Sequence, residues 1–590
     1  MTSGATPAAV VPVPMDPLFA LRARLEDATR AALGEEGAGT DPAIHRSAHA
    51  DYQADLALAL GRRLKRNPRE VAAAIAGKLA ADEVIAAAEV SGPGFINLTL
   101  QPAFLGAQLG RMAADERLGV PRAATPERVV IDYSSPNVAK EMHVGNLRST
   151  IIGDALARLL EHEGHRVIRQ NHIGDWGTPF AMLIEHLLDE RTAGKEANIR
   201  ELGAFYRAAR AKFDADPAFA ERARRRVVLL QGGDQTTLAL WRRIVDASIE
   251  HLTALYARIG VTLRPEDVAG ESHYNPMLAE VVAELQAKGL AVESEGAICV
   301  FPPGFTGREG EPVPLIVRKS DGGYGYPTTD LAAVRYRVQQ LGGQRIIVVV
   351  GAPQSQHLAM VFATARLAGW VPEGVRLEHV AFGSVLGQDK KMFKTRSGES
   401  VPLAALLDEA DQRAARVIES KSPELDAATR AHIASAVGIG AIKYADLSSD
   451  RIKDYVFDWD RMLSFDGNTA PYLMYAHARI RSILRKAGAE GAAAPPPAQI
   501  QLDAPQERAL ALELLQLGAV LAKTAETLQP HRICAFIYQV ATAFTAFYES
   551  CPVLKAEEPA RASRLALCEL TARTLALGLG LLGIAAPQQM

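Results

Sequence analysis

The sequence predicts an α/β protein whose core is a doubly wound parallel sheet. Short runs of β-branched residues, such as RVVIDY (128–133) and RIIVVVG (345–351), are separated by longer stretches with helical periodicity. Runs of this kind are typical of strands buried on both faces of a sheet. The intervening stretches are long enough for crossover helices, so the strands are expected to lie parallel.

The elements are expected in a simple order. Helical patterns occupy 15–34 and 50–87, and SGPGFINLTL (91–100) is typical of a turn that leads into a strand. A helix is expected from 147 after the first core strand, and another from 178. Further core strands are predicted in VIRQNHIGD (167–175), AICVF (297–301), PLIVRK (314–319) and LEHVAFGSVL (377–386). A charged helical insertion is expected at about 190–290, a helix at 401–420, and only helices from about 427 onward.

Length and composition limit the possible classes of protein. A chain of 590 residues allows roughly three or four domains. The net charge of −3 excludes a globally basic nucleic-acid binder, so RNA contact would require local basic patches. The longest apolar run (575–586) is shorter than the roughly 20 residues that span a bilayer, so no membrane role is predicted.

The cysteines and the first residues indicate the compartment. The four cysteines contain no CxxC pair, which argues against a disulfide framework and a cysteine-rich zinc site and favours a reducing cytosol. The opening MTSGATPAAVVPVPM lacks a basic region and is broken by three prolines, so a signal peptide is not predicted.

The stretch SSPNVAKEMHVGNLRST (134–150) carries the strongest indication of function. It connects the first core strand to a helix, and a helix N-terminus offers unpaired N–H groups and positive dipole to phosphates. Gly145 allows close approach of the backbone, Lys140 adds a positive charge, and His143 adds a donor that can become cationic. Taken alone, His143 is better explained as a capping or packing histidine, and its neighbours Gly145 and Lys140 are what favour the functional role.

This stretch resembles the HIGH-signature region of the arginyl-tRNA synthetases, a class I family. The matching positions are Ser135, Pro136, Asn137, Val138, Ala139, Lys140, Glu141, Met142, His143, Val144, Gly145 and Asn146. Asn146 replaces the usual last histidine, and it can donate a hydrogen bond but cannot carry charge. The resemblance implies a Rossmann-type catalytic core that activates L-arginine with ATP and transfers it to the terminal adenosine of its tRNA.

The resemblance also implies roles in binding the nucleotide. Lys140, His143, Gly145 and Asn146 would stabilise the departing phosphates, and His357 would face the nucleotide. The loop GQDKKMFKTRSGESV (387–401) stands where the family has its mobile KMSKS loop, and it would contribute Lys391, Lys394 and Arg396. Met392 occupies the first signature lysine, so we expect Lys140 to take its place. The alternative is a solvated basic loop.

The segment DGGYGYPTTDLAAVRYR (321–337) resembles the part of the family that binds arginine. It implies that Tyr326 packs against the substrate side chain and that Asp330 pairs with the guanidinium. Asp132 lies in an apolar strand, where a carboxylate is costly unless paired, and a cationic substrate would satisfy it. Ser135 and Asn137 would hold the α-amino and carboxylate end, and Gln354 would line the pocket. Asp330 could instead cap a helix that begins at 331.

Two regions are expected to contact tRNA. The basic cluster GRRLKRNPRE (61–70) precedes a GPGFIN turn that resembles the family's N-terminal domain, where Phe95 would stack on a base and Asn97 would hydrogen-bond its edge. The segment 465–487 resembles the start of a DALR-type anticodon-binding domain, with Tyr472 and Arg479 as contacts. Core packing remains the alternative for both Phe95 and Tyr472.

These patterns divide the chain into three domains. The predicted bounds are 1–121 for an α+β tRNA-binding domain, 122–455 for the catalytic domain and 456–590 for an all-helical anticodon-binding domain. The family implies a cytosolic monomer that uses ATP, with Mg²⁺ carried on the nucleotide phosphates and no separate metal site. Asn146 and the altered loop leave one alternative function, a catalytically impaired tRNA-binding relative.

Overall fold

The computed structural model describes residues 15–192, 202–393, 401–488 and 500–590. Its centre is a parallel four-stranded sheet with the order β11-β10-β5-β6, which confirms the predicted fold class. The strands and their crossover helices are β5 (Arg128–Asp132), α5 (Val144–His162), β6 (Arg166–Gln170), β10 (Arg345–Gly351), α13 (Ser355–Leu367) and β11 (Arg376–Phe382). Strand order reverses between β5 and β10, where open α/β sheets bind their ligands.

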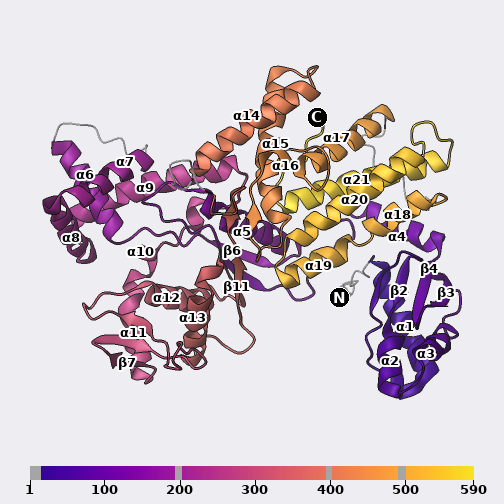
Figure 1. Ribbon diagram of the computed structural model, residues 1–590, viewed down its shortest axis with the longest axis horizontal. Coiled ribbons are helices and arrows are strands. Elements are labelled where there is room, and N and C mark those ends of the chain that lie inside the picture. Colours follow the sequence, from indigo (N-terminus) through magenta and orange to yellow (C-terminus); the bar gives the residue numbers. More distant parts are fainter. Residues whose placement is uncertain (1–14, 193–201, 394–400, 489–499) are drawn as a thin grey trace, which may run out of the picture.

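The N-terminal part is a small α+β unit that stands apart from the core (Figure 1). Its antiparallel sheet has the order β1-β2-β4-β3. The bounds are α1 (Pro17–Leu33), β1 (Ile44–Arg46), β2 (Tyr52–Ala54), α2 (Leu56–Leu64), α3 (Pro68–Ala76), β3 (Ile85–Ser91), β4 (Phe95–Leu100) and α4 (Pro102–Ala114).

The expected helical segment at 50–87 is therefore wrong. It contains two strands and two short helices, because the chain is interrupted where Lys65 ends α2 in a left-handed conformation and Asn67 caps α3 ahead of Pro68.

A helical insertion separates β6 from the later strands. It contains α6 (Thr178–Thr192), α7 (Leu202–Ala215), α8 (Pro217–Gln231), α9 (Gln235–Arg258), α10 (Glu271–Tyr274) and α11 (Leu278–Ala287). An antiparallel sheet follows with β7 (Ala291–Ser294), β8 (Ala297–Val300) and β9 (Leu315–Arg318), and then α12 (Tyr326–Gln339).

The runs at 297–301 and 314–319 thus do not join the parallel sheet, as the sequence had suggested. The cause is a two-residue turn at Glu295 and Gly296, both with positive φ (52° and 76°), which joins β7 and β8 as a tight hairpin.

The last part is helical apart from one strand. Its helices are α14 (Leu403–Lys421), α15 (Ala427–Leu447), α16 (Trp459–Met462), α17 (Ala470–Lys486), α18 (Pro505–Leu514), α19 (Leu517–Thr527), α20 (His531–Ser550) and α21 (Ala560–Leu581). The expectation of helices alone fails at β13 (Tyr455–Val456), which pairs in parallel with β12 (Val385–Leu386). Among the described residues, no helix is both long and apolar enough to cross a membrane.

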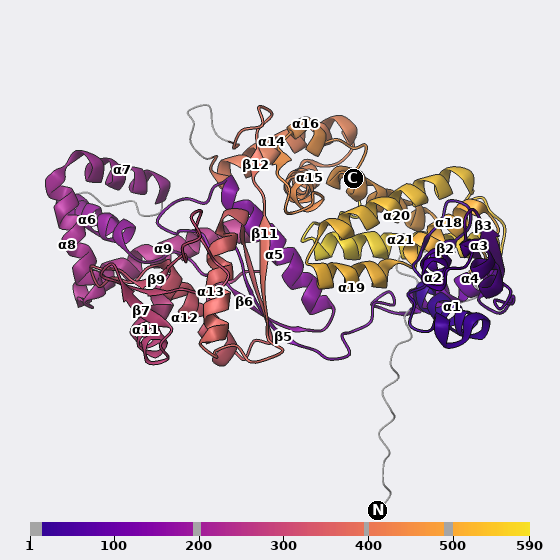
Figure 2. The same ribbon diagram turned by 60° about the horizontal axis from the view of Figure 1, so that its bottom comes forward.

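Helix α5 joins the core to the last helices. It lies between the sheet and helices α15, α19 and α21 (Figures 1 and 2). Arg148 of α5 forms a buried ion pair with Asp446 of α15, with Nε 3.0 Å from Oδ2. The guanidinium also lies over the rings of Phe382 and Tyr455. A buried pair of this kind fixes two elements relative to each other, because separating them would leave a charge without its partner.

Lys443, one turn earlier on α15, is also buried. Its ammonium donates to the carbonyl oxygens of Ile259 (3.0 Å) and Gly583 (2.6 Å), which follow the last residues of α9 and α21. Burial lowers the pKa of Lys443 to about 8. The Lys443 ammonium on α15 thus connects the end of the insertion helix α9 to the end of the last helix α21.

Candidate active site

The candidate site lies at the carboxyl ends of β5 and β10. Asp132 is the last residue of β5 and stands opposite Val348 of β10, so Gly351 and the following turn extend beyond the sheet edge. The short turn 352–354 and α13 continue from there. This is the point of reversed strand order described above, and the sheet itself therefore brings the two strand ends together.

The phosphate turn, residues 137–146, closes with a capping arrangement. Helix α5 begins at Val144, three residues earlier than expected, and His143 is its N-cap. The His143 Nδ1 accepts from the Gly145 N–H (3.0 Å), and the Asn146 Oδ1 accepts from the His143 N–H (3.1 Å). A Cβ on Gly145 would lie 2.8 Å from the imidazole Cε1, so glycine is needed here. Asn146 thus has a structural role that its amide fulfils directly.

Two expectations about this turn need correction. The N–H groups of Val144, Gly145 and Asn146 all have acceptors within the protein, so they are not unpaired donors for phosphates. Burial and the charge of Lys140 lower the pKa of His143, so the neutral imidazole is favoured over the cation. Because Nδ1 accepts a hydrogen bond, the proton of the neutral ring is on Nε2, which is then a donor. Side chains, rather than backbone amides, are left to contact phosphate.

The basic loop returns to the phosphate turn. The Val144 N–H donates to the Val401 carbonyl (3.0 Å), and the Leu403 N–H donates to the Met142 carbonyl (2.9 Å). At the start of the loop, Phe393 stacks on Phe457 with ring centroids 4.7 Å apart. Lys391 is exposed, and Lys394 and Arg396 lie outside the described residues. The structure therefore places the end of the loop, at Val401 to Leu403, beside the phosphate turn.

The insertion also reaches the phosphate turn, through α7. The Lys140 ammonium lies 5.3 Å from the centroid of the Tyr206 ring. Gly203 packs so closely that a Cβ there would lie 2.3 Å from the Glu141 carboxyl carbon. Sequence reasoning missed Tyr206, since nothing in a charged amphipathic helix marks one tyrosine as the neighbour of a lysine 66 positions away.

Asp132 is paired inside the protein. Its Oδ2 accepts from Arg337 of α12 (2.7 Å), and its Oδ1 accepts from the Ser135 hydroxyl (2.7 Å). Burial alone would raise the pKa of Asp132, but Arg337, His172 and these hydrogen bonds lower it overall. A cationic substrate is therefore not needed to satisfy this carboxylate. Ser135 itself has a positive φ of 46° and reaches back toward the strand end.

Asp330 is the fifth residue of α12, and Gly325 is the N-cap, so a capping role for Asp330 is wrong. The Asp330 Oδ2 lies 2.6 Å from the Nε2 of His357 on α13. His357 was expected to face the nucleotide and Asp330 to bind arginine, and the two side chains are thus bonded to each other. Asp330 and Arg337 are seven residues apart and share one helix face.

Two further acids belong to this group and were not predicted. Asp175 follows β6 and accepts from the Ser272 N–H (2.9 Å) and hydroxyl (2.6 Å). Glu271 begins α10, and burial together with the charges of Asp175 and Asp330 raises its pKa to about 7. Both residues lie in or beside the charged insertion, where many acids are solvated, so sequence alone could not distinguish them.

Charge counting in this acidic pocket, which comprises Asp132, Asp175, Glu271 and Asp330, gives an excess of negative charge. Arg337 neutralises Asp132. Burial lowers the pKa of His172, which favours its neutral form. Burial also raises the pKa of Asp175, as it does that of Glu271. A positively charged ligand would favour the ionised forms of both acids, and the three carboxylates of Asp175, Glu271 and Asp330 would then balance its charge.

Other predicted residues are exposed near these elements. Tyr326 opens α12 with 71% of its surface accessible, and Gln354 is exposed at the end of β10's turn. Asn137 is exposed and forms a β-bridge with Gly174. No contact between these three side chains and the acids is recorded among the described residues, so their roles stay predictions.

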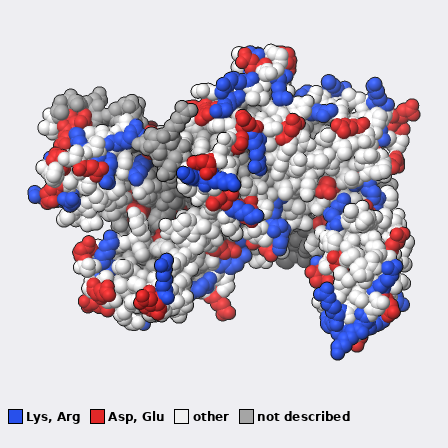
Figure 3. Space-filling view, viewed as in Figure 1, with Lys and Arg blue, Asp and Glu red and all other residues white. Residues whose placement is uncertain are grey.

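The predicted N-terminal RNA contacts share one surface. Arg62, Arg63, Lys65, Arg66 and Arg69 are all exposed, and blue side chains gather on this unit in Figure 3. Arg69 donates to the Gly92 carbonyl (2.9 Å), which places the GPGFIN turn beside the basic cluster. Phe95 is half-buried, and Asn97 donates to the Ser91 hydroxyl (3.1 Å).

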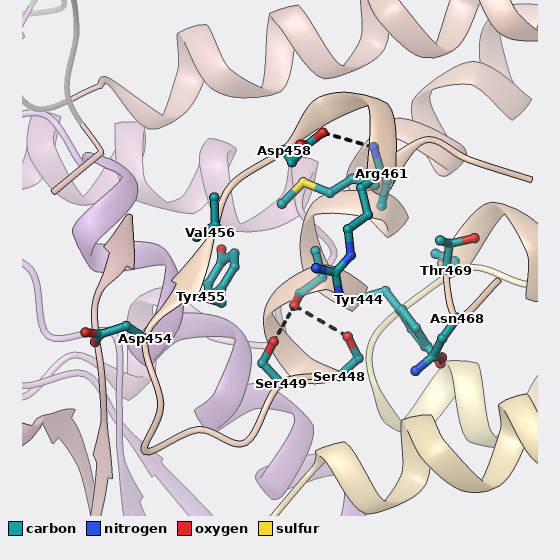
Figure 4. Close-up of a pocket in the computed structure, with 14 residues that line it drawn as sticks. Tyr444, Ser448, Ser449, Asp454, Tyr455, Val456, Asp458, Arg461, Asn468 and Thr469 are labelled. Carbon is teal, nitrogen blue, oxygen red and sulfur yellow. Dashed lines mark hydrogen bonds between the residues drawn. The ribbon is translucent and has the colours of Figure 1, made fainter. Parts of the chain in front are cut away.

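The predicted contacts on α17 are partly used within the protein. Tyr472 packs edge-on against Tyr538, and Arg479 lies 4.6 Å from the centroid of the Tyr548 ring. Below the start of α17 is a cavity of about 280 Å³, and the Arg461 side chain extends into it beside Tyr444 and Asn468 (Figure 4). It combines Arg461 and the hydroxyls of Ser448 and Ser449 with the carboxylates of Asp454 and Asp458, so it has no excess of positive charge for an RNA phosphate.

Three family models match the chain. Residues 108–459 match tRNA synthetases class I (R), catalytic domain; residues 473–590 match the DALR anticodon binding domain; and residues 20–100 match the arginyl tRNA synthetase N terminal domain. Together they extend over nearly all of the described structure.

Similar proteins carry consistent names. The chain is 57% identical to an arginine–tRNA ligase of Thermobifida fusca, over 98% of this chain and 100% of the relative. It is 53% identical to that of Frankia casuarinae, over 94% and 96%. The arginyl-tRNA synthetase structures of Plasmodium falciparum and Thermus thermophilus align with TM-scores of 0.84 and 0.79, each at 28% identity, over 98% and 97% of this chain and all of theirs.

Proposed function

This chain belongs to the arginyl-tRNA synthetases and is a class I arginine–tRNA ligase, and we propose that its acidic pocket binds arginine while the phosphate turn binds ATP. The arginine carboxylate attacks the α-phosphate of Mg²⁺-bound ATP, and pyrophosphate leaves. A ribose hydroxyl of the terminal tRNA adenosine then attacks the arginyl carbonyl, and AMP leaves. Alignment and charge stabilisation are the protein's main contributions.

The excess of negative charge in the acidic pocket carries the assignment of arginine. A guanidinium presents several donors in a planar fork, which suits two carboxylates better than one. Asp330 lies on α12 and Glu271 on α10, and the charge of Asp330 contributes to the raised pKa of Glu271. Asp132 is already occupied by Arg337. We therefore assign Asp330 and Glu271 to the guanidinium, and Asp132, with Ser135, Asn137 and Gln354, to the backbone end of the substrate.

The ATP site rests on side chains of the phosphate turn. His143 contributes a neutral Nε2–H donor, Asn146 contributes the N–H groups of its capping amide, and Lys140 contributes charge. The positive end of the α5 dipole adds to their effect. The capping role of Asn146 accounts for the departure at that position without an impaired site, so the catalytically impaired alternative has no particular observation in its favour.

Several broader features remain proposals. We keep the bounds 1–121, 122–455 and 456–590, which the three matched ranges support. A location in the cytosol fits the four unpaired, buried cysteines, and a monomer is proposed from the family resemblance alone. The basic surface at 62–69 with Phe95 and Asn97, and the face of α17 with Tyr472 and Arg479, would contact tRNA.

The decisive experiment is arginine charging by Asp330→Ala. Loss of a charge-assisted hydrogen bond costs about 2–3 kcal/mol, so kcat/KM for arginine should fall roughly 30- to 150-fold. The KM for ATP in the tRNA-dependent pyrophosphate exchange should change less than the kcat/KM for arginine, because at the nucleotide only the partner of His357 is lost. Asp330→Asn is the matched control, because it can keep a bond to His357 but loses the charge. An unchanged kcat/KM for arginine in both variants would contradict the assignment.

A further inference from the structure

Two consecutive residues just after β5 have a backbone conformation that is unfavourable for any residue but glycine. Ser134 and Ser135 have φ values of 68° and 46°, in the left-handed region. Such residues persist where the surrounding structure holds them in place, and they gather at active sites. The conformation brings the Ser135 hydroxyl to the Asp132 carboxylate, to which it donates (2.7 Å). The strained turn therefore shapes one side of the acidic pocket.

Buried hydrogen bonds hold the backbone of this turn. The Ser134 N–H donates to the hydroxyl of Ser149 on α5 (3.0 Å), and the Ser135 N–H donates to the Oδ1 of Asn171, just after β6 (3.0 Å). The Ser149 hydroxyl donates in turn to the Val349 carbonyl of β10 (2.6 Å). Three elements of the core thus fix the two strained residues.

Tyr256 of the insertion helix α9 completes this arrangement. Its hydroxyl lies 2.8 Å from the Ser134 Oγ and accepts from the Asn171 Nδ2 (3.1 Å). All three residues are buried. Burial raises the pKa of Tyr256 to about 12, so the hydroxyl keeps its proton. A single hydroxyl thus contacts both the Ser134 side chain and the amide that holds the Ser135 backbone.

We propose that Tyr256 is a positioning residue for arginine, whose hydroxyl fixes the strained turn and so holds the Ser135 hydroxyl against Asp132. The proposal rests on the proposed function, because it takes Ser135 and Asp132 as the groups that bind the backbone end of the substrate. The helical insertion would then act on substrate binding through a contact that joins residues 122 positions apart.

The first test is Tyr256→Phe, which keeps the ring and removes the hydroxyl. In the arginine- and tRNA-dependent pyrophosphate exchange, kcat/KM for arginine should fall on the order of tenfold, because a small displacement of a group that orients the reacting end is costly. A wild-type value would contradict the role of Tyr256.

Tyr444→Phe is the matched control for a loss of stability alone. The buried Tyr444 hydroxyl on α15 donates to the Asn468 Oδ1 (2.6 Å) and lies 3.0 Å from the Cys534 carbonyl oxygen, among the last helices. Its removal should lower Tm but leave kcat/KM for arginine as in the wild type. An equal fall of kcat/KM in Tyr444→Phe and Tyr256→Phe would reduce Tyr256 to an ordinary core residue and overturn the proposal.

A second test removes the strain itself. In Ser134→Gly the turn can keep its positive φ without steric cost, so it should depend less on Tyr256. Tyr256→Phe should therefore lower kcat/KM for arginine by roughly threefold or less in the Ser134→Gly background, against about tenfold in the wild type. Equal losses in the two backgrounds would mean that the hydroxyl does not act through this turn.

Ser135→Ala separates the proposal from the function on which it rests. If kcat/KM for arginine falls in Ser135→Ala but not in Tyr256→Phe, the role of Tyr256 is wrong and the assignment of Ser135 stands. If it is unchanged in Ser135→Ala, the assignment of Ser135 to the substrate fails, and the role of Tyr256 fails with it.

Discussion

The phosphate turn and the acidic pocket lie next to each other but are built in different ways. The turn is assembled within ten consecutive residues, because His143, Gly145 and Asn146 hydrogen-bond to one another as a helix cap. The acidic pocket collects side chains from β5, the segment after β6, α10 and α12. The turn therefore depends on local geometry, whereas the pocket depends on the relative placement of distant elements.

The largest effect is expected at the turn. Lys140→Ala should lower the rate of adenylate formation on the order of 100-fold, because a fixed charge near the departing phosphates is removed. The measurement is arginine- and tRNA-dependent pyrophosphate exchange, with Lys391→Ala as the matched control on the basic loop. If Lys391→Ala has the larger effect, Lys140 does not replace the missing loop lysine.

A smaller effect is expected in the acidic pocket, where the KM for arginine should depend on pH. With its pKa near 7, Glu271 is mostly protonated at pH 6 and mostly ionised at pH 8. Arginine binds the ionised form, so KM for arginine should rise up to about tenfold as pH falls from 8 to 6. Binding near pH 7 should also release protons, which calorimetry in two buffers would detect.

Glu271→Gln serves as the control for this effect, since it removes the titrating group and keeps the shape. Its KM for arginine should be higher than that of the wild type at pH 8 and nearly independent of pH. A wild-type KM that is flat between pH 6 and 8 would remove Glu271 from the guanidinium site.

The smallest effect is expected where the insertion contacts the turn. Tyr206→Leu removes a cation–π contact worth about 0.5–1 kcal/mol at an exposed site, so adenylate formation should slow by roughly two- to fivefold. Tyr206→Phe keeps the ring and should match the wild type. If both variants behave alike, the contact between α7 and Lys140 has no part in catalysis.

The contrast between turn and pocket also explains what the sequence could predict. Strand, turn and helix around 128–162 follow from short-range patterns, and the position of the site follows from the parallel sheet. The partners of Asp132 and Asp330 could not be predicted in this way, since Arg337 and His357 become neighbours only after α12 and α13 pack. The capping role of Asn146 was not predicted, because the resemblance to the family assigns this position to catalysis.

The same limit applies to the antiparallel hairpin at β7 and β8. Its strands have the β-branched composition of core strands. They form a separate sheet because the positive φ of Glu295 and Gly296 makes a tight turn that pairs β7 with β8. A two-residue turn of this type is visible in sequence chiefly when it contains Asn-Gly or Asp-Gly, and Glu-Gly is a weaker signal.

The bonds of Lys443 have a consequence for synthesis on the ribosome. Its buried ammonium needs the carbonyl of Gly583, which is added 140 residues later. Until that residue emerges, the nascent chain has a cation at the centre of its helical junction with one of its two recorded acceptors missing. Folding of the enzyme should therefore finish after translation has passed Gly583, and chains stopped earlier should be held by chaperones or degraded.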